Sequence, residues 1–247
     1  SPPMADVLTL STESRHLPPD QARVKVQQAT RRVRTAGWIY KKIDSTLRGS
    51  PAAELAAMMD TLRLSHALVA PAFPAQGRTT VMGRQLIGGV PLDQSTFADE
   101  VTCSDLLQMF SRSGPSDGPP RPVRLVDLST VRRGMDAVLP ALSEPGILIT
   151  DAETDADLST LAQAAVTRGI RLFCGSAGLA HALVCALPML PTIPSFILPR
   201  PMQGPALAVV GSRNARSIRQ VEVAAAQGAT VVTPPPAFVG NHSELHH

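Results

Sequence analysis

Hydrophobic residues follow two patterns that alternate along the chain. Short aliphatic runs, typical of buried strands, are separated by longer segments in which apolar residues recur every three or four positions, as on one face of a helix. Clear helical stripes cover residues 22–36 and 158–166. The strands predicted from the short runs are residues 6–10, 38–43, 66–70, 123–128, 146–150, 170–174, 206–210 and 229–232.

This alternation predicts an α/β fold in three layers, a mostly parallel sheet with helices on both faces. Between residues 78 and 97 the pattern changes, and Gly88-Gly89 between two β-prone stretches predicts a β-hairpin arm. Six prolines in residues 188–205 predict a linker, because proline interrupts both helices and central strands. We therefore divide the chain into a main domain (1–187), the linker (188–205), the start of a second α/β domain (206–233) and a tail (234–247).

The composition limits the classes of function. With 44% hydrophobic and 17% charged residues in 247, the chain is too apolar for a disordered protein. A net charge of +3 and only 3% aromatic residues argue against a nucleic-acid partner. The three cysteines lack metal-type spacing, and no apolar run reaches the roughly 18 residues of a membrane span. We expect a cytoplasmic protein that acts on a small molecule, with no nucleic-acid or membrane partner.

The densest group of polar side chains follows the strand predicted at residues 38–43. Ligands of parallel α/β sheets bind where the strands end, and this strand leads into Asp44, Ser45 and Arg48. A carboxylate can hold a substrate hydroxyl or accept its proton, and a guanidinium can grip a carboxylate through two parallel hydrogen bonds. The pattern predicts a hydroxy-acid site. The alternative is a turn in which Asp44 simply pairs with Arg48.

Two further polar loops follow predicted strands. The loop after residues 66–70 contains two prolines, which would stiffen it so that it presents Gln76, Arg78 and Thr79 to a ligand. A proline-stiffened connection to the hairpin arm is the alternative. The segment that contains Arg15 follows the first predicted strand, and on its own it indicates no more than a polar loop.

Two glycine-rich turns each lie between a predicted strand and a helix. The first contains Gly175, Ser176 and Gly178, and the second contains Gly211 and Ser212. Glycines let a phosphate approach main-chain N–H groups at the positive end of a helix. Neither turn matches the P-loop or the dinucleotide-binding fingerprint. The turns therefore indicate either one anionic ligand that spans a cleft or close packing of helices on strands, which would require the same glycines.

The residue sequences of several segments are more informative than the spacing of single residues. In chain order they read KKIDSTLRG, APAFPAQGRTT, STFADE, LITDAETDADL, GSAGLAHAL and VVGSRNARSIRQ. On these six segments the chain resembles the four-carbon acid sugar kinase family, from about residue 5 to residue 232. Members of that family have an N-terminal substrate domain and a C-terminal nucleotide domain. They phosphorylate the terminal hydroxyl of threonate, erythronate or 3-oxo-tetronate with ATP and Mg²⁺.

The resemblance implies roles for the residues described above. Residues 1–187 would bind the acid sugar, and residues 206–233 would be a fragment of the nucleotide-binding domain. Asp44 and Arg48 would be the catalytic pair. The other substrate contacts would come from Arg15, Lys42, Ser45, Gln76, Arg78 and Thr79. The residues toward the nucleotide would be Gly175, Ser176, Gly178, Gly211 and Ser212. Mg²⁺ is expected with ATP, but no metal-ligating residue is assigned.

The sequence departs from the family pattern at both ends. The family's opening strand and its Asp-Asp-x-Thr-Gly-Ala turn, which carries the natural candidates for the catalytic base, have no counterpart here, and most of the nucleotide domain would follow residue 232. The first hypothesis is an ATP-dependent sugar acid kinase, with the activity of this chain alone and its pairing into a homodimer left open. The alternative is a non-catalytic module that binds hydroxy acids. The absence of a dinucleotide fingerprint disfavours a third hypothesis, an oxidoreductase.

Overall fold

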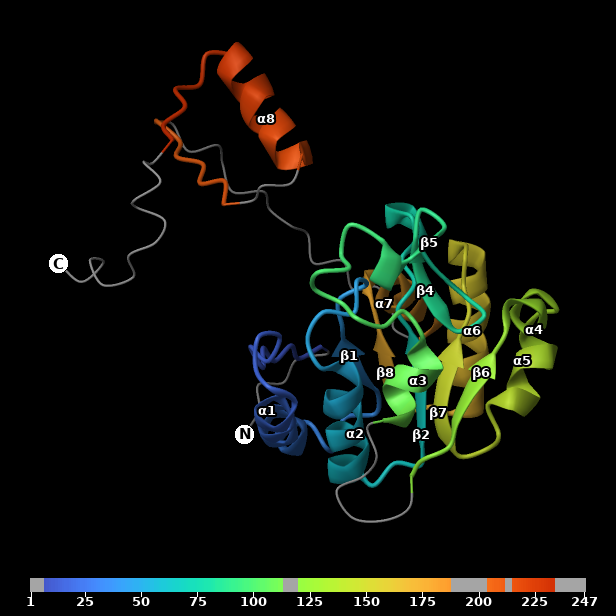
Figure 1. Cartoon of the computed structure of the whole chain (residues 1–247). Helices are drawn as coiled ribbons and strands as arrows, with labels where there is room; N and C mark the ends of the chain where they lie inside the picture. The colour runs from blue at the N-terminus through green and yellow to red at the C-terminus, as the bar shows by residue number, and fades with distance from the viewer. Residues whose placement is uncertain (1–6, 113–119, 188–203, 212–214, 234–247) are drawn as a thin grey trace. The chain divides into compact units, whose positions relative to one another are not determined.

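A five-stranded parallel sheet forms the centre of the larger of two compact units. The computed structural model describes residues 7–112, 120–187, 204–211 and 215–233, and the two units are Ser1–Pro191 and Thr192–His247. The strand order is β1-β8-β2-β7-β6, and every neighbouring pair is parallel (Figure 1). The strands are β1 (Ile39–Lys42), β2 (His66–Ala70), β6 (Val123–Val126), β7 (Gly146–Thr150) and β8 (Leu172–Gly175). The predicted parallel α/β sheet is confirmed.

The composition of each strand agrees with its position in the sheet. β2 and β7 are apolar along almost their whole length and lie in the interior of the sheet, where both faces are covered. β1 and β6 contain charged residues and form the two edges. Charged side chains on an edge strand also discourage pairing with another chain. These are five of the eight predicted strands, and each lies within two residues of its expected limits.

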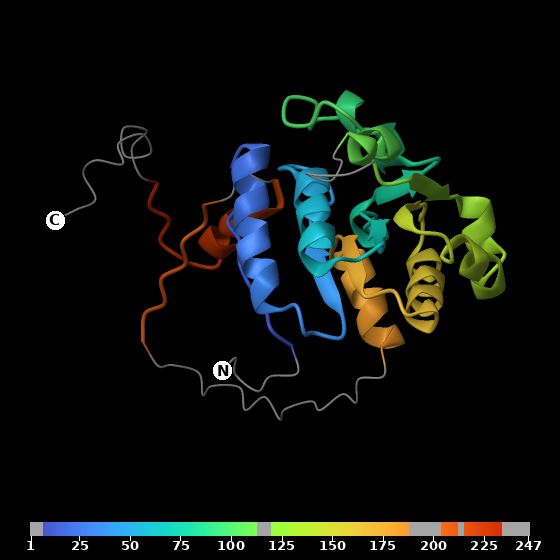
Figure 2. The same cartoon turned by 90° about the horizontal axis from the view of Figure 1, so that it is seen from below.

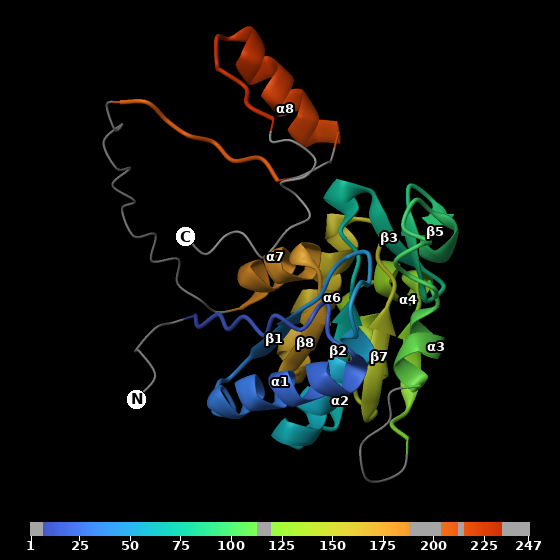
Figure 3. The same cartoon turned by 60° about the vertical axis from the view of Figure 1, so that its left-hand side comes forward.

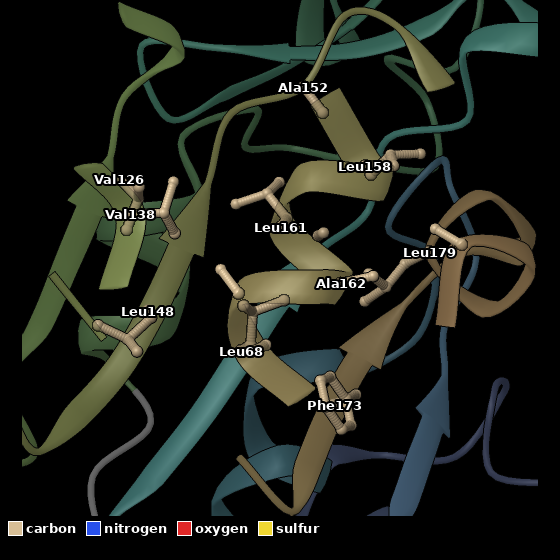
Figure 4. Close-up of a cluster of buried hydrophobic side chains, with 14 of the residues drawn as sticks. Leu68, Val126, Val138, Leu148, Ala152, Leu158, Leu161, Ala162, Phe173 and Leu179 are labelled. Carbon is tan, nitrogen blue, oxygen red and sulfur yellow. The ribbon is translucent and has the colours of Figure 1, made fainter. Parts of the chain in front are cut away.

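Helices cover both faces of the sheet, which confirms the three layers. On one face, Leu55 of α2 and Phe110 of α3 belong to one buried cluster. On the other face, Leu68 and Phe173 of the sheet belong to a second cluster with Leu161 of α6 (Figure 4). The helices are α1 (Pro19–Arg32), α2 (Pro51–Leu62), α3 (Leu106–Ser111), α4 (Leu128–Arg132), α5 (Met135–Ala141), α6 (Asp155–Arg168) and α7 (Ala177–Ala186).

The helix α6 shows how local sequence sets an element. The Thr154 hydroxyl accepts a hydrogen bond from the N–H of Asp157 (3.1 Å), and the Asp157 carboxylate accepts one from the N–H of Thr154 (2.9 Å). This capping box satisfies N–H groups that the helix itself cannot bond. The helix ends at Gly169, whose φ of 79° is the left-handed conformation that glycine adopts readily. Leu158 and Leu161 are fully buried, so the predicted apolar stripe is confirmed.

A small antiparallel sheet forms the predicted arm. It consists of β3 (Arg78–Val81), β4 (Arg84–Ile87) and β5 (Val90–Pro91), and it lies beyond the carboxyl ends of the parallel strands (Figures 1 and 3). Gly88-Gly89 connects β4 to β5 as predicted, whereas Met82-Gly83 forms the turn of the longer β3–β4 hairpin. Both turn residues have positive φ, 52° and 71°, as a tight hairpin requires. The 3-10 turns η1 (Pro74–Gln76) and η2 (Leu92–Gln94) flank the arm.

Three predicted strands are wrong. Residues 7–10, 206–210 and 229–232 are not in strands, and Leu207 and Val232 are 91% and 83% exposed. An extended segment is stable as a strand only when a neighbour satisfies its N–H and C=O groups, and no described strand pairs with these segments. The described part of the smaller unit contains the helix α8 (Ala215–Ala226) and no sheet. The predicted tail and most of the predicted linker lie outside the described residues.

Within the described ranges, no helix is long and apolar enough to cross a membrane.

Candidate functional site

The loops that follow the parallel strands lie at one edge of the sheet. Because all five strands run in the same direction, their carboxyl ends meet there. The N–H of Ile43, after β1, donates to the carbonyl of Gly175 at the end of β8 (2.9 Å). The hydroxyl of Ser176 donates to the carbonyl of Ala72, after β2 (2.6 Å). Three of the loops that the sequence singles out are therefore neighbours.

Asp44 organises the turn that follows β1. One oxygen of its carboxylate, Oδ1, accepts hydrogen bonds from the N–H and the hydroxyl of Thr46, each at 3.0 Å. The other oxygen, Oδ2, accepts from Nε and Nη2 of Arg48 at 2.8 and 2.7 Å. The backbone N–H of Leu47 closes the turn on the Asp44 carbonyl (2.9 Å). The alternative prediction, a turn in which Asp44 pairs with Arg48, is therefore what the structure contains.

The pairing leaves part of Arg48 accessible. Its side chain is 33% exposed, and Nη1 donates to a carboxylate oxygen of Glu100 at 3.2 Å. A guanidinium has five N–H groups, so two remain beyond the two bound by Asp44 and the one bound by Glu100. Arg15 also reaches Asp44 Oδ2 at 3.7 Å, and its side chain is 52% exposed. The turn thus presents guanidinium groups at the edge of the sheet.

The electrostatics of this turn favour the binding of an anion. They do not favour Asp44 as a base that removes a proton. Burial would raise the pKa of Asp44, but hydrogen bonds from Thr46 and Arg48 outweigh burial and lower the pKa below its ordinary value. Such a carboxylate is a poor proton acceptor at neutral pH. Burial lowers the pKa of Lys42, a change that Asp44 opposes, and its ammonium donates to the Ile43 carbonyl at 2.7 Å.

A buried glutamine that the sequence did not single out connects the arm to the Asp44 turn. The side-chain NH₂ of Gln85, on β4, donates to the carbonyl of Ser45 at 2.8 Å, and its oxygen accepts from the hydroxyl of Thr80 on β3 at 2.8 Å. Gln85 and Thr80 are fully buried, and Ser45 is 8% exposed. The contact with Ser45 is therefore made through its backbone, and it holds the turn in register with the arm.

A second buried side chain, Asp151, fixes the turn of the arm. Asp151 follows β7 and is 1% exposed. Its carboxylate accepts hydrogen bonds from the N–H groups of Met82 (2.8 Å), Gly83 (2.9 Å) and Leu128 (3.2 Å). Burial raises the pKa of Asp151, and these N–H donors oppose the change. The LITDAETDADL segment thus contributes an anchor for the hairpin that carries Arg78.

The residues predicted after β2 lie partly together. Nη1 of Arg78 donates to the Gln76 side-chain oxygen at 3.0 Å, so these two side chains are neighbours. Side chains of successive strand residues point to opposite faces, which puts Arg78 on the same face of β3 as Thr80 and puts Thr79 on the other. Nε of Arg78 is buried and has no hydrogen-bond partner among the described residues. Arg78 and Thr79 therefore cannot face one ligand from the same side of the arm.

The first glycine-rich turn is explained by packing. A Cβ atom at Gly175 would lie 2.6 Å from the Ala70 carbonyl oxygen, and one at Gly178 would lie 2.7 Å from the Ala72 carbonyl oxygen. Ser176 is 1% exposed and caps α7 by accepting from the N–H of Gly178 at 3.1 Å. The alternative of close helix–strand packing is thus present, and the approach of a nucleotide to this turn stays a prediction.

This packing gives a stability prediction. Gly178→Ala is expected to lower the free energy of unfolding by about 2–3 kcal/mol, because backbone must shift to admit the methyl group, although alanine favours helix. Gly37→Ala is the matched control, since its Cβ would meet no heavy atom within 4 Å, and it should change stability by less than about 0.5 kcal/mol. Urea denaturation measures both. Equal values for the two variants would contradict the packing role.

The second glycine-rich turn belongs to the smaller unit. Gly211 is exposed, and Ser212 lies outside the described residues. The predicted approach of Gly211 and Ser212 to the nucleotide stays a prediction.

The described residues contain no group of three or more His, Cys, Asp or Glu side chains able to hold a metal ion. Mg²⁺ is usually bound by one or two carboxylates together with phosphate oxygens and water. Asp44 already accepts hydrogen bonds at both oxygens, and Asp151 is enclosed by backbone N–H groups.

The chain is similar to a sugar-binding domain family and to sugar acid kinases. A family model described as a sugar-binding N-terminal domain matches residues 2–183. The chain is 37% identical over 239 residues to a D-threonate kinase of Salmonella typhimurium, covering 92% of this chain and 53% of the relative. It is 33% identical to a D-erythronate kinase of Heliobacterium modesticaldum, covering 88% of this chain and 50% of the relative. The chain spans about half the length of these curated relatives.

The chain is also similar to solved structures. A Bordetella bronchiseptica protein with bound citrate, a domain-swapped dimer, has a TM-score of 0.59 and 30% sequence identity, covering 72% of this chain and 45% of its own. A Haemophilus influenzae protein has a TM-score of 0.61 at 22% identity and covers 70% of this chain and 44% of its own. The second similarity shows the fold alone.

Proposed function

Since this chain belongs to the four-carbon acid sugar kinase family, through its sugar-binding N-terminal domain, we propose that it is the part of a sugar acid kinase that binds the acid substrate. The whole protein would transfer the terminal phosphoryl group of ATP to the terminal hydroxyl of threonate, erythronate or 3-oxo-tetronate. The relatives named as kinases of these three acids support the substrate class.

The arrangement around Arg48 is the observation that carries this proposal. Arg15 and Arg48 pair with Asp44, and Lys42 interacts with it electrostatically. Among the described residues, Glu100 is the one other acid paired with Arg48. The cluster therefore keeps a positive charge that suits a small carboxylate. Arg48 and Arg15 would bind the substrate carboxylate, and a substrate would displace the exposed Glu100 from Nη1. The bound citrate of the Bordetella protein, a hydroxy acid, supports such a ligand.

Asp44 would act on the substrate chiefly through Arg48. Its Oδ2 oxygen accepts from both Nε and Nη2 and so holds the guanidinium by one edge, which fixes the direction of the remaining N–H groups before the substrate arrives. Asp44 is then a positioning residue, and direct contact with a substrate hydroxyl would require this pair to open. Ser45, Gln76 and either Arg78 or Thr79, which lie on opposite faces of β3, remain the proposed substrate contacts, and Arg78 adjoins Gln76 where the loop enters the arm.

Phosphoryl transfer depends mainly on positioning and on stabilising charge, so the acid-binding part contributes by orienting the hydroxyl. ATP would supply the phosphoryl group, with Mg²⁺ held chiefly by its phosphates. At the first glycine-rich turn, the nucleotide would be contacted only by main-chain N–H groups at the start of α7, those of Gly175, Ser176 and Gly178. The Ser176 hydroxyl is not available because it already makes hydrogen bonds within the fold. The domain-swapped dimer of the Bordetella protein supports a homodimer as the assembly.

Calorimetry on the 247-residue chain tests the substrate class. D-Threonate, D-erythronate and 3-oxo-tetronate are titrated separately, and at least one is expected to bind. Erythritol, a four-carbon polyol without a carboxylate, is the matched control and is expected not to bind, because Arg48 and Arg15 would have no anion to grip. If none of the three acids binds, or if erythritol binds as tightly, the proposed substrate is wrong.

The second candidate, a module that binds hydroxy acids without catalysis, is favoured by one observation. Hydrogen bonds from Thr46 and Arg48 lower the pKa of Asp44 and leave this carboxylate a poor proton acceptor. A form that spans the length of the kinase relatives would be assayed for ATP consumption with and without each acid. Consumption that requires an acid supports the kinase, and binding of an acid without ATP binding or turnover supports the module.

A further inference from the structure

Two adjoining cavities open at the amino ends of the strands, opposite the Asp44 turn. α2 runs from the carboxyl end of β1 back to the start of β2, so its last turn lies at this opposite edge. The cavities have volumes of about 540 and 400 Å³, both within the usual range for small-molecule sites, and both are open to solvent. Both are lined by Gln27, Asp60 and Arg63, the larger also by Arg121, and the smaller also by Arg31 and Arg34. We refer to the pair as the Asp60 cavity.

The lining of the Asp60 cavity is strongly basic. Four arginines face a single carboxylate, that of Asp60, which is already bound by Arg121 and by Arg23. Among the described residues, the side chains of Arg31, Arg34 and Arg63 make no hydrogen bond or ion pair. The helices α1 and α2 lie side by side (Figure 2), and the last turn of α2 adds a partial negative charge of about one half. This does not cancel the surplus of positive charge.

Arg121 provides stronger evidence for a bound anion than solvent-exposed arginines at helix ends do. Its side chain is only 19% exposed, and Nη2 is bound to Asp60. Nη1 of the same guanidinium is buried and has no hydrogen-bond partner among the described residues. A buried charged donor without an acceptor is costly. An anion in the cavity that Arg121 lines would supply the acceptor.

Arg63 provides a second, independent observation. It is the residue that ends α2, with φ 55° and ψ 42°, in the left-handed conformation that favours glycine at this position. Its N–H caps the helix by donating to the Asp60 carbonyl (3.2 Å), a task that glycine performs without the cost of a Cβ. Strained backbone of this kind is concentrated at binding sites. Glycine would suit this turn better, so the presence of an arginine points to a role for its side chain.

We propose that the Asp60 cavity binds a small anion that carries a phosphate group. The planar guanidinium matches the oxygens of phosphate through pairs of hydrogen bonds, and a doubly charged phosphate with three terminal oxygens can engage several guanidiniums at once. Arg121 and Arg63 would provide the principal contacts, with Arg31 and Arg34 at the rim. This site is separate from the proposed acid sugar site and does not depend on the proposed function.

Pyrophosphate is a suitable probe. Its Kd for the full chain is measured by calorimetry, and thermal unfolding is then followed with pyrophosphate at 100 times that Kd. Linkage predicts a rise in Tm of about 5–10 °C. Sodium chloride at equal ionic strength is the comparison, and it should not reproduce the rise. A rise that chloride reproduces in full would show general screening and overturn the proposal.

Two variants separate binding from folding. Arg63→Gly removes the guanidinium and relieves the strain of the left-handed backbone conformation. Without an anion this variant should therefore unfold at the same or a higher temperature than the wild type. Its Kd for pyrophosphate should rise at least about 10-fold. Arg121→Gln should also raise the Kd about 10-fold. Arg168→Ala, which removes an arginine from the last turn of α6 on the other face of the sheet, is the control and should leave the Kd within about twofold. Unchanged Kd values in both Arg63→Gly and Arg121→Gln would overturn the proposal.

Discussion

Arg48→Ala is expected to weaken binding of the four-carbon acid that the wild-type chain binds by about 100-fold, the largest functional effect predicted for this protein. Hydrogen bonds to a charged group contribute roughly 1.5–3 kcal/mol each, so even the lower value gives about 3 kcal/mol for two bonds to a carboxylate, which corresponds to somewhat more than 100-fold. The change also releases Asp44 from the pair that orders its turn. Calorimetric titration of the variant with that acid measures the effect.

Two further variants make this result specific. Arg48→Lys keeps the charge but not the paired N–H groups, so it should lose about 10-fold in affinity. Arg133→Ala removes an exposed arginine in contact with Thr130, away from the turn, and should leave affinity unchanged. Because the Arg48 side chain is one-third exposed, its removal should cost the fold less than about 1 kcal/mol. An Arg48→Ala protein that is folded and binds the acid as tightly as the wild type would refute the proposed site.

Asp151→Ala is expected to have the largest effect on stability, a loss of roughly 3 kcal/mol or more in the free energy of unfolding. The carboxylate is buried and accepts from three backbone N–H groups, and a buried donor left without a partner costs about 1–3 kcal/mol. The N–H groups of Met82 and Gly83 form the turn of the β3–β4 hairpin, so the arm should loosen first. Urea denaturation measures the total loss.

The same substitution at another aspartate provides the control. Asp105 caps α3 by accepting from the N–H of Gln108 at 2.9 Å near the surface, and Asp105→Ala should cost only about 1 kcal/mol. Asp151→Asn retains one acceptor oxygen and should lie between the two. If Asp151→Ala were no more destabilising than Asp105→Ala, the carboxylate would not be the anchor of the arm.

Much of the fold could be predicted from local patterns. The apolar runs of β2 and β7 are unbroken because both faces of these strands are covered, and their limits agree with the prediction residue for residue. The runs at 206–210 and 229–232 carry the same local pattern but form no strand. A strand depends on a partner elsewhere in the chain, and a run of valines does not report whether one is present.

The candidate site was predicted in its position more than in its contacts. Parallel strands followed by polar residues placed Asp44, Ser45 and Arg48 at the correct edge of the sheet. The contact of Arg48 with Glu100 joins residues 52 apart, and the contact of Gln85 with Ser45 joins residues 40 apart. Both depend on how the arm folds back on the parallel sheet, and no periodicity in the sequence reports that geometry. The sequence also does not show that Thr46 occupies one oxygen of Asp44, and the role of Asp44 as a substrate contact stays a prediction.

Residue order along this chain was sufficient to establish a parallel α/β unit, a basic turn after β1 and kinship with sugar acid kinases, since these follow from periodicity and short motifs. The three-dimensional arrangement assigned the partners: Arg48 to Asp44 and Glu100, Asp151 to the arm, and Arg121 to the Asp60 cavity. The physical reason is that hydrogen bonds and ion pairs act over a few ångströms in space, whereas their donors and acceptors here are mostly tens of residues apart along the chain.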